Sequence, residues 1–171
     1  MEHIVRKAIK GDDEAFLDII RSCKADLYKT ALAYMRNEEE ALEAVQEVTF
    51  RAYRSIKDLK QPAYFKTWII RIMIHYCCDR LKKQHRLVYN EQLLPAAGGE
   101  EDTLLFEVQD AMEALDDRSR ELLTLKYFHD LKIKEVAALY NRPEGTVKTW
   151  LNKALKSLRE KLEESGGKMD V

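Results

Sequence analysis

Apolar side chains recur every three or four residues along most of the chain, which is the spacing of amphipathic helices. The first such stretch covers residues 12–36, where Asp12 is placed as an N-cap and Asn37 as a stop, and a second covers residues 38–56. A third stretch, over residues 62–84, carries apolar side chains on more than one face, so we expect it to be largely buried. The first half of the chain therefore predicts one small helical domain.

The periodicity stops between residues 87 and 103. This segment contains Pro, Gly and four acids but no Lys or Arg, a composition typical of a flexible acidic linker. Helical spacing returns at 104–115. Asp116 or Asp117 caps the next helix, which runs to about Phe128, and shorter helices follow at 133–140 and about 144–163. The predicted fold class is all-α, with two small helical domains at 1–86 and 104–163, a flexible acidic linker at 87–103 and a tail at 164–171.

Composition narrows the functional classes. Hydrophobic residues make up 46% and charged residues 35%, which indicates a folded soluble protein, and only six Gly and three Pro disfavour a turn-rich β fold. Because thirty acids nearly cancel twenty-nine bases, any affinity for nucleic acid must come from local charge. The chain start lacks a signal-peptide pattern, no stretch approaches the ~20 apolar residues of a membrane span, and the three cysteines form no CxxC pair. These features predict a cytoplasmic protein.

The strongest local motif lies at residues 133–152. Ala137 provides the small side chain that close helix packing needs, and Asn141, four residues later, tolerates the left-handed conformation of a tight turn. Val147, ten residues after Ala137, can pack the second helix back on the first. This pattern predicts a helix-turn-helix, whose second helix enters the major groove of DNA.

The second helix of this motif separates a buried stripe from a polar face. At about 100° per residue, Val147 and Leu151 fall on the buried side, and the opposite side carries hydrogen-bond donors and no acid. Segment 130–161 holds eight bases against four acids, which favours DNA binding over the alternative of an ordinary helical hairpin with a solvated face. The predicted DNA-binding residues of this domain are Arg142, Glu144, Gly145, Thr146, Lys148, Thr149, Asn152, Lys153 and Lys156.

The helix of the first domain that spans residues 66–86 carries six bases against one acid, interleaved with aromatic residues. Cations neutralise phosphates and aromatic rings stack on unpaired bases, so this composition suits melted DNA. A core helix with a buried Trp and a solvated basic end fits the composition equally well. The predicted DNA-binding residues here are Lys66, Trp68, Arg71, His75, Asp79, Lys82, Lys83 and Arg86.

One alternative function is an enzyme or metal site, because His75 and Asp79 lie four residues apart on one helix face beside Cys77 and Cys78. Adjacent cysteines point about 100° apart on a helix, and no further His or Cys motif completes a ligand shell. No Gly-rich phosphate loop or catalytic triad order is present either. We therefore expect no enzymatic activity, no cofactor and no metal.

Several motifs, taken in order, resemble one known family over nearly the whole chain. Residues 40–50, EALEAVQEVTF, are similar to the polymerase-binding helix of the extracytoplasmic-function (ECF) sigma factors, the two-domain branch of the sigma-70 family. Residues 68–82 match the W-x3-I-x2-N-x3-D-x2-R pattern of that family's promoter-melting helix, with His75 for Asn and Lys82 for Arg. The second domain resembles the family at Leu115, Arg120, Leu125, 135–137 and 145–148. Trp150 stands where the family often has Arg, at the edge of the buried stripe, which favours packing over DNA contact.

The resemblance implies a sigma factor that binds core RNA polymerase and directs promoter-specific initiation in a stress or envelope response. It further implies that the first domain recognises and melts the downstream promoter element, that the second reads the upstream element, and that an anti-sigma factor, often membrane-tethered, is a partner. The residues implied to bind polymerase are Ala41, Leu42, Val45, Gln46 and Phe50.

A stand-alone helix-turn-helix transcriptional regulator is the other alternative. Such proteins normally dimerise on paired half-sites and carry a ligand or receiver domain. The first domain of this chain shows no βα alternation, and only a short tail follows the helix-turn-helix. A gel shift with the chain alone, without polymerase, discriminates between the two.

Overall fold

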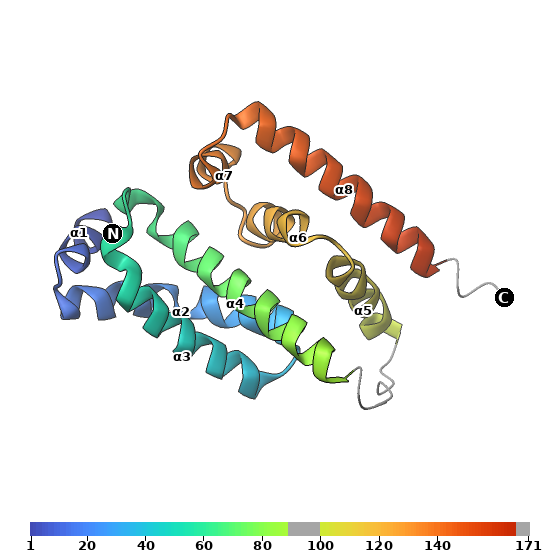
Figure 1. Ribbon diagram of the computed structural model, residues 1–171, viewed down its shortest axis with the longest axis horizontal. Helices are drawn as coiled ribbons and strands as arrows, with labels where there is room; N and C mark the ends of the chain where they lie inside the picture. Colours follow the sequence, from blue (N-terminus) through green and yellow to red (C-terminus); the bar gives the residue numbers. More distant parts are fainter. Residues whose placement is uncertain (89–99, 167–171) are drawn as a thin grey trace. The chain divides into compact units, whose positions relative to one another are not determined.

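The part of the chain that the structure describes folds entirely into helices and their connecting turns (Figure 1). The structure is a computed structural model that describes the backbone of residues 1–88 and 100–166 and the side chains of residues 1–84 and 107–164. The chain divides into two compact units, Met1–Gln92 and Leu93–Val171. The all-α class predicted from the apolar spacing is confirmed.

The described residues of the first unit form four α-helices and two short 3-10 turns. The helices are α1 (Glu2–Ile9), α2 (Asp13–Met35), α3 (Glu38–Ser55) and α4 (Phe65–Val88), and the turns are η1 (Ile56–Asp58) and η2 (Pro62–Tyr64). No prediction from the sequence covered α1, which is eight residues long and buries only Val5 and Ala8. Two turns of helix offer too few apolar positions for a periodic signal.

The junction between α2 and α3 differs from its prediction. Asp12 caps α2 as expected, since its Oδ1 accepts the Ala15 N–H at 3.0 Å. The residue after α2 is Arg36, in the left-handed region at φ 54°, and its N–H donates to the Leu32 carbonyl. Asn37, predicted to stop α2, instead begins α3, because its Oδ1 accepts the Glu40 N–H at 3.0 Å. Asn37, which was expected to end α2, is therefore the N-cap of α3.

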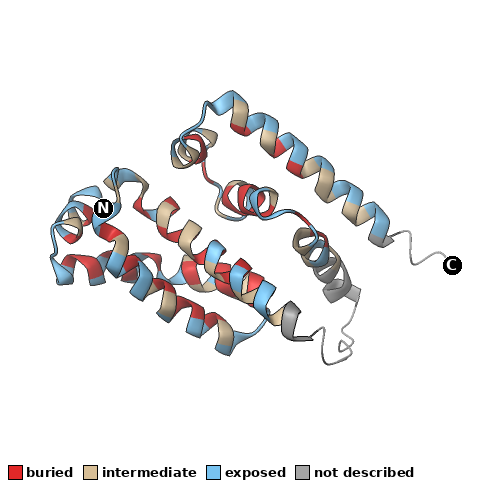
Figure 2. Cartoon of the chain, in the orientation of Figure 1, coloured by how far each residue is buried: buried red, intermediate tan, exposed pale blue. Residues whose placement is uncertain are grey.

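The core of the first unit lies where α2, α3 and α4 pack against one another, with α1 on α2. Leu27, Val48 and Ile69 have no exposed surface, and Figure 2 shows the buried residues along the inner sides of these helices. Helix α4 also buries Ile70, Ile74 and Cys77, which extends its apolar surface over more than one face as predicted. Burying a Leu or Ile side chain contributes roughly 1.5–3 kcal/mol.

The second unit contains α5 (Glu100–Glu113), α6 (Asp117–Leu123), the single π-turn η3 (Thr124–Phe128), α7 (Ile133–Tyr140) and α8 (Glu144–Gly166). Helix α8 packs on α5, α6 and α7. Asp116 is the N-cap of α6, with its Oδ2 accepting the Ser119 N–H at 3.3 Å.

The predicted linker was too long at both ends. Helix α4 continues to Val88, and α5 begins at Glu100 rather than at residue 104, so between these two helices residues 89–99 lie outside the described chain. The error has a physical basis, because acidic residues suit both a solvated tether and the positive end of a helix.

A buried arginine joins α5 to α6. Arg120 is 8% exposed, and its Nε donates to the Met112 carbonyl at 2.8 Å while a terminal nitrogen donates to the Glu113 carbonyl. Both carbonyls belong to the last turn of α5, where helical N–H donors run out, and the Met112 carbonyl also accepts the Leu115 N–H at 3.3 Å. The side chain of α6 therefore completes the end of α5.

We expect Arg120→Met to lower the free energy of unfolding of this unit by about 1–3 kcal/mol, because the Met112 and Glu113 carbonyls lose the hydrogen bonds of the guanidinium. Arg120→Lys, which keeps the charge on a single donor nitrogen, should fall between Met and wild type. Denaturant unfolding followed by circular dichroism measures both. Equal stability of all three proteins would show that the cap contributes nothing.

Candidate nucleic-acid and polymerase interfaces

One face of α4 gathers most of the residues predicted to contact melted DNA. At about 100° per residue, positions 68, 71, 75, 79, 82 and 86 fall within about 80° of one another, and the buried residues of α4 lie on the other sides of the helix. His75, Asp79 and Lys82 are exposed, and Trp68 is half-buried with its ring 5.8 Å from that of Phe65. Arg86 lies in α4 but outside the described side chains, and Lys83 is exposed at the edge of this face. We call residues 68, 71, 75, 79, 82, 83 and 86 the α4 face.

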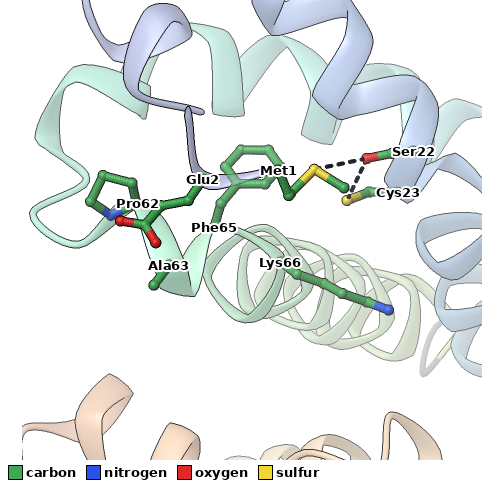
Figure 3. Close-up of a pocket in the computed structure, with 8 residues that line it drawn as sticks. All are labelled: Met1, Glu2, Ser22, Cys23, Pro62, Ala63, Phe65 and Lys66. Carbon is green, nitrogen blue, oxygen red and sulfur yellow. Dashed lines mark hydrogen bonds between the residues drawn. The ribbon is translucent and has the colours of Figure 1, made fainter. Parts of the chain in front are cut away.

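Lys66 does not belong to the α4 face. It lies about 160–200° around the helix from Trp68 and His75, and its Nζ is 2.7 Å from Asp26 Oδ2 of α2. It also lines a pocket of about 310 Å³ with Met1, Ser22 and Cys23 (Figure 3). Composition alone could not separate Lys66 from the other bases, because position around the helix matters more than position along it.

Polar contacts hold the side of α4 that faces α3. Arg80 lies 3.6 Å from Glu43, and one turn further along α4 the Gln84 side-chain amide donates to Glu40 Oε1 at 2.7 Å. These contacts fix the rotation of α4 about its own axis, together with the buried apolar residues. As a result, the α4 face is turned outward. Arg80 contacts α3 and is not part of the α4 face.

Helix α3 divides the five residues implied to bind polymerase into two groups. Leu42 and Phe50 are 51% and 55% exposed, and Gln46 between them is exposed as well, so the three form one line at i, i+4 and i+8. Ala41 and Val45 are 0% and 8% exposed and pack inside the bundle. Their predicted contact with polymerase is corrected to a packing role, because the bundle covers the face on which they lie.

The helix-turn-helix forms as the sequence predicted. Asn141 adopts the left-handed conformation at φ 50° and ψ 49°, and the Arg142 N–H donates to the Ala137 carbonyl at 3.0 Å. Ala137 and Val147 are 4% and 0% exposed, which is the close packing that their spacing indicated. Glu135 accepts the Lys132 N–H at 2.8 Å and so stabilises the start of α7.

The predicted DNA-reading side of α8 faces solvent. Lys148, Thr149, Asn152 and Lys156 are all exposed, as are Arg142, Glu144, Gly145 and Lys153, whereas Thr146 is half-buried. The Thr149 hydroxyl donates to the Gly145 carbonyl at 3.0 Å, which leaves its oxygen as an acceptor toward a base. Lys156 lies 3.9 Å from Glu160, but this ion pair is exposed and too weak to prevent Lys156 from binding a phosphate.

No prediction from the sequence covered the exposed pair Tyr127–Phe128 or the partners of Trp150. Tyr127 and Phe128 are 60% and 50% exposed at the end of η3, and exposed aromatic rings are typical of protein contact surfaces. Trp150 packs edge-on against Tyr140 at 5.8 Å between ring centroids, and the Arg118 guanidinium lies 4.8 Å from its ring centroid. The predicted packing of Trp150 agrees with these contacts, but its partners could not be named from the sequence.

The cysteines of α4 do not provide a reactive site. Cys77 and Cys78 are 0% and 5% exposed, and burial raises the pKa of the Cys77 thiol to about 12. The thiolate needed for metal binding or nucleophilic attack is therefore disfavoured at neutral pH. Among the described residues, no cluster of three His, Cys, Asp or Glu side chains is arranged to hold a metal ion. No described helix is both long and apolar enough to cross a bilayer.

A helix-turn-helix in one unit and a basic, aromatic helix face in the other are features found in DNA-binding proteins. Residues 19–87 match the family model for sigma-70 region 2, and residues 105–158 match that for sigma-70 region 4. The chain belongs to the ECF branch of the sigma-70 family, and it acts as a sigma factor that directs RNA polymerase to promoters. A stand-alone regulator is not favoured, because both sigma regions are present in order.

Sequence relatives agree with this assignment, and solved structures share the fold. The chain is 34% identical to RNA polymerase sigma factor SigV of Bacillus subtilis, over 81% of this chain and 86% of that one. It is 30% identical to ECF RNA polymerase sigma factor SigW of the same organism, over 95% and 98%. CnrH, solved in complex with the cytosolic domain of CnrY, shares the fold at a TM-score of 0.65 and 20% identity, over 95% of this chain and 97% of that one. The sigma factor RpoE of Bartonella quintana, solved with the anti-sigma factor NepR, aligns at a TM-score of 0.56 and 20% identity, over 88% and 96%.

The separation of Lys66 from the α4 face gives a test with matched variants. We expect Lys82→Gln to weaken promoter opening by holoenzyme and to make its log–log salt dependence shallower by about 0.9, the value of one phosphate contact. Lys66→Gln loses only a surface ion pair and should leave both unchanged. Opening is measured by permanganate footprinting over a salt series. Equal effects of the two substitutions would show that rotation about α4 does not decide contact.

Proposed function

We propose that this sigma factor divides its tasks among three surfaces. The line Leu42–Gln46–Phe50 on α3 binds core polymerase, the α4 face recognises and opens the downstream promoter element, and the exposed side of α8 reads the upstream element. The observation that carries the proposal is the outward placement of all three surfaces on helices whose opposite faces are buried. Catalysis stays with the polymerase, and this chain contributes recognition and melting in the cytoplasm.

The chemistry of each surface suits its partner. Two large apolar side chains flank the exposed amide of Gln46, and such exposed apolar residues among polar ones mark protein interfaces. The α4 face combines a tryptophan with cations, which can stack on an unpaired base and hold phosphates. The α8 side offers Asn and Thr for base edges and Lys for phosphates.

We further propose regulation by an anti-sigma factor. CnrH and RpoE, which share the fold, were each solved with a protein partner, an anti-sigma factor in the case of RpoE. A partner of this kind that covers the α3 line or the exposed Tyr127–Phe128 pair would block access by other proteins. Tethering of that partner to a membrane, and a role in an envelope or stress response, belong to this proposal.

Charge placed in the α3 line should break polymerase binding. We expect the double change Leu42→Asp and Gln46→Asp to weaken the affinity for core polymerase by at least about 2 kcal/mol, because it adds two charges to a packed interface. Leu17→Asp on α2 is the matched control, since Leu17 is 48% exposed against 51% for Leu42. Fluorescence anisotropy of labelled protein with core enzyme measures the affinity. A folded double variant that binds as tightly as the Leu17 control would exclude this docking surface.

Two substitutions on α8 should have different signatures. Asn152→Ala should change base preference at one or two positions of the upstream element, by about 1–3 kcal/mol each, because it removes a base-edge contact. Lys156→Ala should weaken binding to all sequences alike and flatten the salt dependence. Selection from a randomised upstream element, followed by sequencing, measures the preference. An unaltered profile for Asn152→Ala would mean that α8 enters the groove in another register.

A further inference from the structure

An aromatic stack crosses three helices beside the DNA-reading side of α8. The Tyr140 hydroxyl of α7 donates to Glu121 Oε2 of α6 at 2.6 Å, and Glu121 is 4% exposed. The Trp150 ring of α8 meets the Tyr140 ring edge-on, at an interplanar angle of 81°. The Arg118 guanidinium of α6 then lies over Trp150, 4.8 Å from the ring centroid.

Trp150 and Arg118, at the end of this stack, lie at one flank of α8. At about 100° per residue, Trp150 lies about 60° from the buried Val147 and about 60° from the exposed Lys153, so it lies between the buried stripe and the flank of α8 that carries Lys153. Arg118 is exposed, and within the described part of the chain it takes part in no ion pair. The Asp116 carboxylate two residues away is engaged with the Ser119 N–H as the cap of α6.

A guanidinium held on a ring is well prepared to bind phosphate. Stacking leaves the N–H groups at the edge of the guanidinium plane free to donate, and two of them can meet one phosphate. Because the ring limits the rotamers of the arginine before binding, less side-chain entropy is lost on contact. The part-buried hydrogen bond from Tyr140 to Glu121 in turn holds the ring against which Trp150 packs.

We propose that Arg118 is a further DNA-binding residue, which Trp150 presents to the phosphate backbone flanking the upstream element. Tyr140 and Glu121 are positioning residues for this contact. The inference rests on the proposed role of α8 in reading that element. It adds to the DNA interface a cation that comes from α6, outside the helix-turn-helix itself.

The test measures the affinity of holoenzyme for promoter DNA over a salt series. Arg118→Gln should weaken binding about fivefold near 0.15 M salt for every sequence, and should make the log–log slope shallower by about 0.9, as expected for one lost phosphate contact. Arg21→Gln, which removes a 73% exposed arginine from α2, is the control for general loss of charge. An affinity and slope for Arg118→Gln that match those of Arg21→Gln would overturn the proposal.

Two variants at position 150 test the presentation of the guanidinium. Trp150→Leu leaves the charge of Arg118 in place but removes the ring, and it should still reduce the slope. The double variant Arg118→Gln with Trp150→Arg moves the cation onto α8 at the same flank, and it should recover most of the affinity and the slope. A double variant as weak as Arg118→Gln alone would contradict a contact at this flank.

Asn152→Ala separates this inference from the function on which it rests. If Asn152→Ala alters base preference while Arg118→Gln behaves like its control, α8 reads the upstream element and only the Arg118 contact fails. If neither substitution has an effect on binding, the proposed role of α8 fails, and with it the role of Arg118.

Discussion

The first unit depends on the burial of one side of α4 between α2 and α3. Ile69, Ile70 and Ile74 lose all contact with solvent there, and the polar contacts of Arg80 and Gln84 with α3 fix the rotation of the helix. A helix rotated by one residue would turn by about 100° and would hide Trp68 or Lys82 in the core. The same packing that stabilises the bundle therefore selects which cations and rings face DNA.

In the second unit, packing among shorter helices likewise decides which side of α8 is exposed. Its α6 and α7 are seven and eight residues long, and helices of that length are marginal alone. Arg120 completes the end of α5, Asn141 permits the turn into α8, and Val147 packs against the first helix of the motif. These contacts hold α8 on its neighbours and leave its polar side exposed for recognition.

Much of this architecture was predictable because helical periodicity is a property of a single segment. The spacing of apolar residues located α2, α3, α7 and α8 closely, and the Ala137–Asn141–Val147 pattern located the turn. Helix ends were less predictable, because one side chain can serve either side of a junction. Asn37 was expected to stop α2 and caps α3 instead, and acids expected in the linker open α5.

The sequence by itself determined the fold class, the helix-turn-helix and the faces on which the charged and aromatic residues lie. Only the tertiary structure decided which of these residues remain available. It assigned Lys66 to Asp26 of α2, placed Ala41 and Val45 inside the bundle, and brought Arg118 onto Trp150. The physical reason is that position around one helix follows from local geometry, whereas the partner of a side chain depends on which other helix packs beside it.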